Sequence, residues 1–426
     1  MLRTLAAEAA RRFGQGVSFT AVRSAEQAQR AQPEFGRGQA ETSAETAVIN
    51  EADTWRLTYA DLDRLSDEAA AGLAFRGVLP GDVVAVVLPT TPEFPICYLA
   101  AVKIGAIVAG LDPRWPATLL DRLTDLLRPA VTVAPYGLNI GPGPDGELVR
   151  ITLARNAADA LAGFRRAELP PPPLPPDPGR PAVIAFNSGR SGTPQGAVFG
   201  VRQLDAIRAA EAGERWGGTV GGVMLTAMPF AHYNLMTRLP AILQSGQTCV
   251  LMGSWRAESV PSIAAAVQAN RLTALPAQLA ELAAKADQPP DSFPSIELIV
   301  TGAAAPPPGL VASLRHRLGT QVQVRYGCAE AGLGLSTCPD HPTDVDGCVG
   351  CPVPGVTLAL RDSGGHEVPH GETGEVLLRS AACMSGYWSN PQASAAAFTM
   401  DHFVRTGDRG RLDGEGRLVL AGRAGA

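Results

Sequence analysis

The segment from Phe186 to Gly196 reads Phe-Asn-Ser-Gly-Arg-Ser-Gly-Thr-Pro-Gln-Gly, and it continues the run Ala-Val-Ile-Ala-Phe, which predicts a buried strand. Its three glycines permit a close approach of the backbone to a ligand. The hydroxyl groups of Ser188, Ser191 and Thr193 can donate hydrogen bonds to phosphate oxygens. A strand that runs into such a loop is a known way to hold polyphosphates. Taken alone, the loop is also typical of a Ser/Gly-rich surface turn, and it lacks the Gly-Lys-Ser/Thr of the Walker pattern.

Short β-rich runs alternate with longer Ala/Leu-rich runs on both sides of this loop. Strands are expected at Val83–Leu88, Ile107–Leu111, Val131–Ala134, Val183–Phe186, Thr248–Met252, Glu297–Thr301 and Val322–Arg325, with helices at Pro92–Gly105 and Ala117–Leu127. This rhythm predicts parallel sheets with crossover helices.

The chain divides by composition into three parts. The proline-rich run from Leu169 to Pro181 predicts a polyproline-like linker, because so many missing N–H groups exclude helix and central strand. After Gly350 short strands alternate with Gly/Asp turns (Val356–Arg361, Gly374–Leu378, Arg417–Leu420). We therefore predict an α/β protein with two packed α/β subdomains with mostly parallel sheets, at residues 1–180 and 181–350, and a small β-barrel-like subdomain at 351–426.

Composition narrows the class of protein. The 426 residues are 46% hydrophobic and 18% charged, which excludes global disorder. A net charge of −5 without a basic tract argues against nucleic acid as the partner. No stretch predicts a membrane span, since Leu99–Leu111 is short and carries Lys103. The odd number of cysteines, seven, favours a reducing cytoplasm.

Further short motifs follow in order along the chain. They are Leu57-Thr-Tyr-Ala-Asp-Leu62, Leu99 to Pro113, Pro229-Phe-Ala-His232, Thr301-Gly-Ala-Ala304, Tyr326-Gly-Cys-Ala-Glu330, Gly371-Glu-Thr-Gly-Glu375, Gly386-Tyr-Trp388, Arg405-Thr-Gly-Asp408 and Gly422-Arg423. Together with the loop at 186–196, this ordered series resembles the AMP-forming adenylating enzymes, which include acyl-CoA synthetases, luciferases and the adenylation domains of peptide synthetases. The resemblance spans about residues 45–426, and its pattern is most similar to acyl- or aryl-CoA ligases.

This resemblance implies a reaction and its cofactors. A carboxylate would attack the α-phosphate of ATP to give an acyl-adenylate and pyrophosphate, and the acyl group would then pass to a thiol such as coenzyme A. Glu330 would bind Mg²⁺, whose preferred ligands are hard oxygens. The loop would hold the β- and γ-phosphates through Ser188, Gly189, Ser191, Gly192, Thr193 and Gln195.

The same resemblance assigns the remainder of a nucleotide site. The backbone of Gly302, Ala303 and Ala304 would face adenine, and the ring of Tyr326 would stack on it. Asp408 would accept hydrogen bonds from both ribose hydroxyls, and Arg423 would lie near the ribose. Without the other motifs of the series, the simplest interpretation of Glu330 would be a solvated carboxylate, and that of Asp408 a turn residue.

The segment around His232 indicates which kind of acid is activated. Outside this motif context, His232 itself would more often be a histidine of the core. Amino-acid-activating members carry an aspartate here, whereas this chain has Pro-Phe-Ala-His-Tyr-Asn-Leu. An acyl or aryl carboxylate without an amino group is therefore expected, in a pocket lined by His232, Tyr233, Asn234 and residues 302–306. A small-molecule acid, with an acyl-carrier or lid-bearing protein as a further partner, follows from the resemblance.

Three departures from the family pattern keep a second function open. Gln195 stands where the loop has lysine, with Arg190 in the place of a hydroxyl residue, and Ala329 replaces a threonine. The sequence stops where the family continues into a C-terminal lid that carries a catalytic lysine, which is expected if the chain is a shortened piece, if a partner supplies the lid, or if the enzyme is impaired. The alternatives are an active ligase in which Arg190 contacts phosphate, and a degenerate member that binds nucleotide or acyl-adenylate without efficient catalysis.

A possible zinc site falls outside the resemblance. Cys338, His341, Cys348 and Cys351 form two ligand pairs in a Pro/Gly/Asp-rich loop, a donor set that suits tetrahedral Zn²⁺. The alternative is a loop with reduced thiols, because Cys348 and Cys351 overlap a Gly-x-Val-Gly-x-Pro stretch common in the family.

Overall fold

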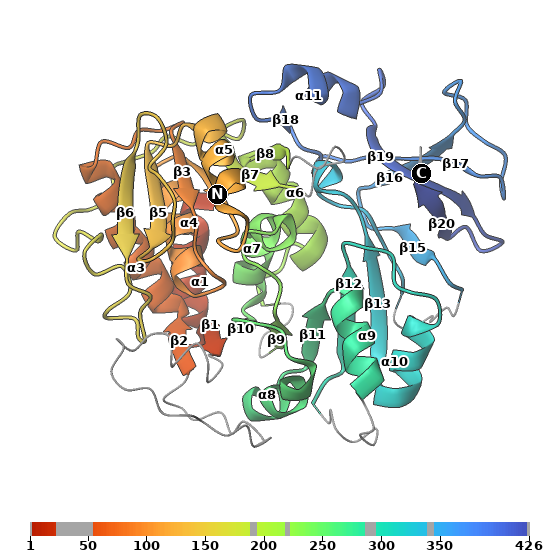
Figure 1. Cartoon of the computed structure of the whole chain (residues 1–426), viewed down its shortest axis with the longest axis horizontal. Coiled ribbons are helices and arrows are strands. Elements are labelled where there is room, and N and C mark those ends of the chain that lie inside the picture. The colour runs from red at the N-terminus through yellow and green to blue at the C-terminus, as the bar shows by residue number, and fades with distance from the viewer. Residues whose placement is uncertain are drawn as a thin grey trace.

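The structure, a computed structural model, confirms the α/β fold, with two sheets and helices packed around them (Figure 1). It describes residues 2–22, 54–187, 194–217, 222–285, 295–338 and 345–423. No helix in these ranges is long and apolar enough to cross a membrane. No disulfide joins any of the seven cysteines, all of which the structure describes.

One sheet has seven strands in the order β18-β8-β7-β4-β3-β5-β6. Their bounds are β3 Val83–Val86, β4 Ile107–Gly110, β5 Val131–Pro135, β6 Glu147–Ile151, β7 Pro181–Phe186, β8 Gly196–Gly200 and β18 Gly386–Tyr387. The strands from β7 to β6 are parallel, as the strand–helix rhythm predicts, whereas β8 and β18 add antiparallel strands at one edge.

The other sheet has thirteen strands in the order β16-β17-β19-β20-β15-β14-β13-β12-β11-β9-β10-β1-β2. Their bounds are β1 Val17–Val22, β2 Thr54–Thr58, β9 Val223–Thr226, β10 Thr248–Met252, β11 Arg271–Ala274, β12 Leu298–Gly302, β13 Gln321–Tyr326, β14 Leu335–Ser336, β15 Cys348–Pro352, β16 Thr357–Arg361, β17 Gly374–Arg379, β19 Val404–Leu412 and β20 Leu418–Arg423. It is parallel from β1 to β13 and antiparallel from β13 to β16, and the strands from β15 onward form the small β unit.

The helices cover the faces of these sheets. They are α1 Leu2–Phe13, α3 Tyr59–Phe75, α4 Glu93–Lys103, α5 Ala117–Leu127, α6 Val201–Ala212, α7 Tyr233–Ser245, α8 Val260–Val267, α9 Pro276–Lys285, α10 Leu310–Leu318 and α11 Pro391–Ala397. α1, α3 and α4 pack together on the side of the first sheet, while α8, α9 and α10 lie beside β11 to β13 (Figure 1). Lys103 is buried, and its charge is balanced there because its Nζ lies 2.7 Å from carboxylate oxygens of both Asp63 and Asp67.

Each sheet contains strands from all three of the sequence segments proposed as subdomains. The proposed boundary at residue 180 falls between β6 and β7, which belong to the same sheet, and β1 and β2 join the sheet built mainly from residues after 220. The boundary at residue 350 falls inside β15. Long-range strand pairing, which has no local sequence signal, makes these connections.

Candidate active site

A cavity of about 790 Å³ lies where the carboxyl ends of strands from both sheets meet. It is lined by Phe186 and Asn187 at the end of β7, by residues after β12 and β13, and by β19 and β20. Of the residues predicted from the sequence, it brings together His232, Ala303, Ala304, Tyr326, Glu330, Asp408 and Arg423. Ligands of open α/β sheets bind at this end of the strands. Ser188, Gly189, Arg190, Ser191, Gly192 and Thr193 lie outside the described residues.

Glu330 is held by two side chains from the other sheet. It sits in a short 3₁₀ turn after β13 and is only 3% exposed. Its Oε1 accepts hydrogen bonds from Asn187 Nδ2 at 2.7 Å and from Tyr387 Oη at 2.5 Å. Its Oε2 has no hydrogen-bond partner among the described residues. One oxygen is therefore fixed in place while the other is open to a ligand.

This arrangement fits a divalent cation. Mg²⁺ is usually held by one or two carboxylates together with waters and substrate phosphates, so a single fixed carboxylate oxygen suits it. Asn187 and Tyr387 were not predicted as site residues, although both lie inside quoted motifs, at 186–196 and 386–388. Their role depends on side-chain contacts between the two sheets.

Asp408, Tyr326 and Arg423 form a connected group at the other side of the cavity. Asp408 and Arg423 are paired across β19 and β20, and Arg423 Nε donates to Asp408 Oδ1 at 3.2 Å. Tyr326 Oη donates to Asp408 Oδ2 at 2.8 Å. Burial and the charge of Asp408 raise the pKa of Tyr326, which keeps its hydroxyl a donor. A carboxylate offers about four acceptor positions, so Asp408 retains capacity for two more hydroxyl groups.

The backbone after β12 bends sharply at the cavity wall. Ala303 has a φ of +67°, in the left-handed region that alanine rarely adopts. The Cβ of a residue at Gly302 would lie 2.4 Å from the carbonyl oxygen of Arg325, so glycine is required there. Residues 303–305, which follow this tight turn, line the cavity.

His232 caps the N-terminus of α7, and it lines the cavity. Its Nδ1 accepts from the backbone N–H of Asn234 at 3.3 Å, which leaves the proton on Nε2 of the neutral ring. Burial, together with the charge of Arg238, lowers the pKa of His232 to about 4, against the opposing effect of Asp112. The imidazole is therefore neutral at pH 7.

Acid should destabilise the fold through this histidine. Because its pKa is about 4 when folded and near 6.5 when unfolded, the unfolded state binds the proton first as the pH falls. Between pH 6.5 and pH 4 the wild type should lose about 3 kcal/mol more unfolding free energy than His232→Asn, which keeps an N-cap acceptor but does not titrate. Urea unfolding at several pH values measures this. The exposed His366→Asn is the matched control and should follow the wild type; equal slopes for wild type and His232→Asn would contradict the assignment.

The predicted zinc site is not supported. Cys348 is buried, whereas Cys351, three residues further along β15, is exposed. His341 lies outside the described residues, and the described ranges contain no cluster of three or more His, Cys, Asp or Glu side chains that could hold a metal ion. The spacing of the cysteines is therefore not accompanied by a metal-binding cluster among the described residues.

Gln195 forms hydrogen bonds with two neighbouring asparagines. Its Oε1 accepts from Asn390 Nδ2 at 3.1 Å, and its backbone N–H donates to Asn187 Oδ1 at 3.1 Å. It thus helps to orient the asparagine that holds Glu330. Ala329 is buried beside Glu330.

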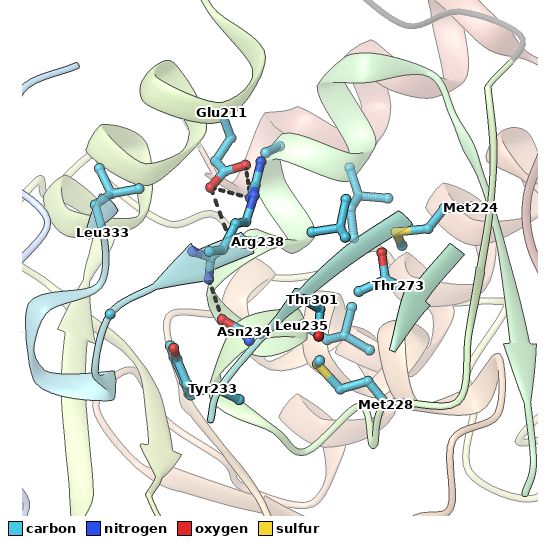
Figure 2. Close-up of a pocket in the computed structure, with 18 of the residues that line it drawn as sticks. Glu211, Met224, Met228, Tyr233, Asn234, Leu235, Arg238, Thr273, Thr301 and Leu333 are labelled. Atoms are coloured by element: carbon cyan, nitrogen blue, oxygen red, sulfur yellow. Dashed lines mark hydrogen bonds and ion pairs between the residues drawn. The ribbon is translucent and has the colours of Figure 1, made fainter. Parts of the chain in front are cut away.

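A second cavity of about 190 Å³ is lined by seven residues of α7, among others, and Figure 2 shows part of its lining. The two share lining residues, namely Tyr233, Ala303, Arg325, Tyr326 and Gly327. Tyr233, Asn234 and Gly302, expected to line an acid pocket, lie here.

This second cavity contains an ionic network that the sequence did not reveal. Glu211 Oε1 accepts from Arg238 Nε at 3.2 Å and from Arg325 Nη1 at 2.8 Å, and its Oε2 lies 2.6 Å from Arg325 Nη1. Arg238 Nη1 also donates to Asn234 Oδ1 at 2.8 Å, as Figure 2 shows. Despite burial, the two guanidinium groups lower the pKa of Glu211 to about 2.

The fold and the cavity define a class of α/β protein with a deep ligand site at the carboxyl ends of its strands, open to a smaller side pocket. Comparisons with known proteins narrow this class. The family model described as "AMP-binding enzyme" matches residues 35–388. The chain therefore belongs to the AMP-binding enzyme family.

Individual proteins agree with this family. The chain is 28% identical to an indoleacetate–CoA ligase of Aromatoleum aromaticum, over 86% of this chain and 73% of that protein. It is 26% identical to the fatty acid–[acyl-carrier-protein] ligase ScoC of Streptomyces coeruleorubidus, over 88% and 74% of the two chains. The inhibitor-bound N-terminal domain of FACL13 from Mycobacterium tuberculosis superposes with a TM-score of 0.80 over 99% of both chains at 21% identity, a similarity of fold.

Proposed function

We propose that this protein activates a carboxylic acid with ATP and transfers the acyl group to a thiol, coenzyme A or a carrier protein. The observation that carries the proposal is the single cavity that gathers Glu330, His232, Tyr326, Asp408 and Arg423 from distant parts of the chain. The relatives that act as CoA ligases and as a carrier-protein ligase support the thiol as acceptor.

In the first step a carboxylate oxygen of the acid forms a bond to the α-phosphorus, and the bond to the pyrophosphate breaks. Asp408 would bind the ribose hydroxyls, Arg423 would lie beside them, and the Tyr326 ring would pack on adenine. The neutral His232 would offer its Nε2–H as a hydrogen-bond donor at the mouth of the acid pocket. In the second step a thiolate attacks the acyl carbonyl, and AMP leaves with the bonding electrons.

Mg²⁺ would supply positive charge to offset the phosphate oxygens during displacement. Glu330 would hold it through the open Oε2, with Asn187 and Tyr387 keeping the other oxygen in place. The phosphate-contacting loop at 188–193, including Arg190, stays a proposal from the sequence.

A second candidate is a member that binds nucleotide without efficient catalysis. It is favoured by Gln195, a neutral amide tied to Asn390 where the family has a charged lysine. Loss of one such electrostatic contact costs on the order of 10²–10³ in rate. A separate lid-bearing protein would be a partner under either candidate.

The deciding experiment is ATP–pyrophosphate exchange across a panel of carboxylic acids. Exchange with at least one acid, dependent on Mg²⁺, supports the ligase. Silence with every acid, together with AMP binding by titration calorimetry, supports the second candidate.

The nucleotide site makes a sharper prediction about AMP. Asp408→Ala should weaken AMP binding at least tenfold, because each charge-assisted hydrogen bond to a buried carboxylate contributes about 1.5–3 kcal/mol. Ser188→Ala is the matched control and should change it little, since AMP has no β- or γ-phosphate for the loop to hold. Titration calorimetry with AMP measures both, and the reverse order would overturn this placement of the ribose.

A further inference from the structure

The side pocket is long and narrow. Its lining follows α7 from Tyr233 to Ser245, a span of about 18 Å at 1.5 Å per residue. Its volume of about 190 Å³ somewhat exceeds the ~150 Å³ of a cavity that holds benzene. By that comparison it accommodates a chain of about six to eight carbon atoms.

The pocket wall combines apolar and cationic side chains. Met224, Met228, Leu235 and Ile242 supply thioether and aliphatic surface (Figure 2 labels the first three). Three arginines, Arg238, Arg271 and Arg325, also line it, against the single carboxylate of Glu211. Arg238 and Arg325 share that carboxylate, so the lining carries two positive charges in excess.

Arg271 is the arginine without a partner. It begins β11 next to Met224 of β9, at the amino end of the strand. Its side chain makes no hydrogen bond or ion pair with any described residue. Thr273, two positions on and therefore on the same face of β11, has a hydroxyl that is likewise unpaired within the described ranges. Burial and the charge of Arg325 lower the pKa of Arg271, opposed by Glu211.

The register of β11 gives the level at which the backbone of Arg271 lies in the pocket wall. Arg271 is in register with Leu298 of β12, four residues before Gly302 at the mouth of the pocket. At about 3.3 Å per strand residue, the Cα atoms at these two levels lie roughly 13 Å apart, and the long side chain of Arg271 spans part of that distance. A ligand that reaches both must be extended.

We propose that the pocket selects an extended acid whose far end is a second carboxylate, with the methylene chain against the apolar wall and the distal carboxylate paired with Arg271 and Thr273. The inference rests on the proposed function, in which the near carboxylate reacts. A guanidinium can bind a carboxylate through two parallel hydrogen bonds, which gives specificity as well as affinity. A monocarboxylic acid would leave Arg271 unpaired in the occupied pocket.

The test compares adipate with hexanoate, which differ in the distal carboxylate on the same six-carbon chain. In ATP–pyrophosphate exchange the wild type should show a kcat/KM ratio, adipate over hexanoate, of at least ten. Arg271→Met should lower that ratio at least tenfold, and Arg271→Lys should restore part of it. Arg56→Met, an exposed arginine of β2 outside both cavities, is the matched control and should leave the ratio unchanged.

A binding measurement separates this inference from the proposed function. Adipate without ATP should raise the Tm of the wild type and of Arg56→Met, but not that of Arg271→Met. A ratio at or below one, or the same ratio in Arg271→Met, overturns the inference and leaves the ligase standing. If no acid supports exchange, the proposed function fails, and the Tm experiment then decides the pocket: no shift with adipate overturns the inference as well.

Discussion

Glu330→Gln is expected to lower the rate of ATP–pyrophosphate exchange by about 10²–10³-fold. The amide has the size of the carboxylate, and its oxygen can still accept from Asn187 and Tyr387, so the cavity wall should keep its shape. What is lost is the negative charge on the oxygen open to a cation. Exchange assays at several Mg²⁺ concentrations measure the effect, and AMP affinity, which depends on the distant Asp408, should change less than about threefold.

Tyr387→Phe is the companion to this variant. It removes one of the two donors that hold Oε1 but leaves the charge, so it should raise the Mg²⁺ concentration needed for half-maximal exchange and recover near-normal rates at saturation. That recovery distinguishes a positioning residue from a structural one. Wild-type exchange in Glu330→Gln would remove Glu330 from the reaction.

The parts of the fold with local signals were predictable. α5 at Ala117–Leu127 and β10 at Thr248–Met252 have the predicted bounds, because their apolar spacing and flanking residues are local features. The pairing of β1 with β2 and β10 was not predicted, since the partners lie far apart in sequence. Pairing between strands that lie so far apart in the sequence leaves no periodic pattern from which it could be predicted.

The cavity shows the same division. Glu330, Asp408 and Arg423 could be named because each sits in a short motif, and the cavity gathers them. The residues that orient them could not: Asn187 reaches Glu330 across 143 positions, and Tyr387 across 57. The zinc prediction is not supported by the described residues, in which Cys348 is buried and Cys351 exposed, and His341 lies outside them.

The network of Glu211, Arg238 and Arg325 is also a long-range contact, since Arg325 lies 114 positions from Glu211. We expect it to contribute to the stability of the fold. Removing one member of a buried ion cluster leaves the others unpaired, at a cost of about 3–5 kcal/mol. The side chain of Glu211 is 17% exposed and that of Arg325 34%, so solvent reduces the penalty. We expect Glu211→Gln to lower the unfolding free energy at pH 7 by about 3 kcal/mol.

The stability lost in Glu211→Gln should depend on pH. The pKa of Glu211 is about 2 when folded and near 4.5 when unfolded, so the unfolded state takes up the proton first. Its contribution is therefore complete above pH 4.5 and lost as the pH falls toward 2. The stability difference between wild type and Glu211→Gln, measured by urea unfolding, should shrink across that window. Glu258→Gln, which removes a carboxylate from an exposed pair with Lys285, should cost less than about 1 kcal/mol, and an equally small loss in Glu211→Gln would show that the two arginines do not need this carboxylate.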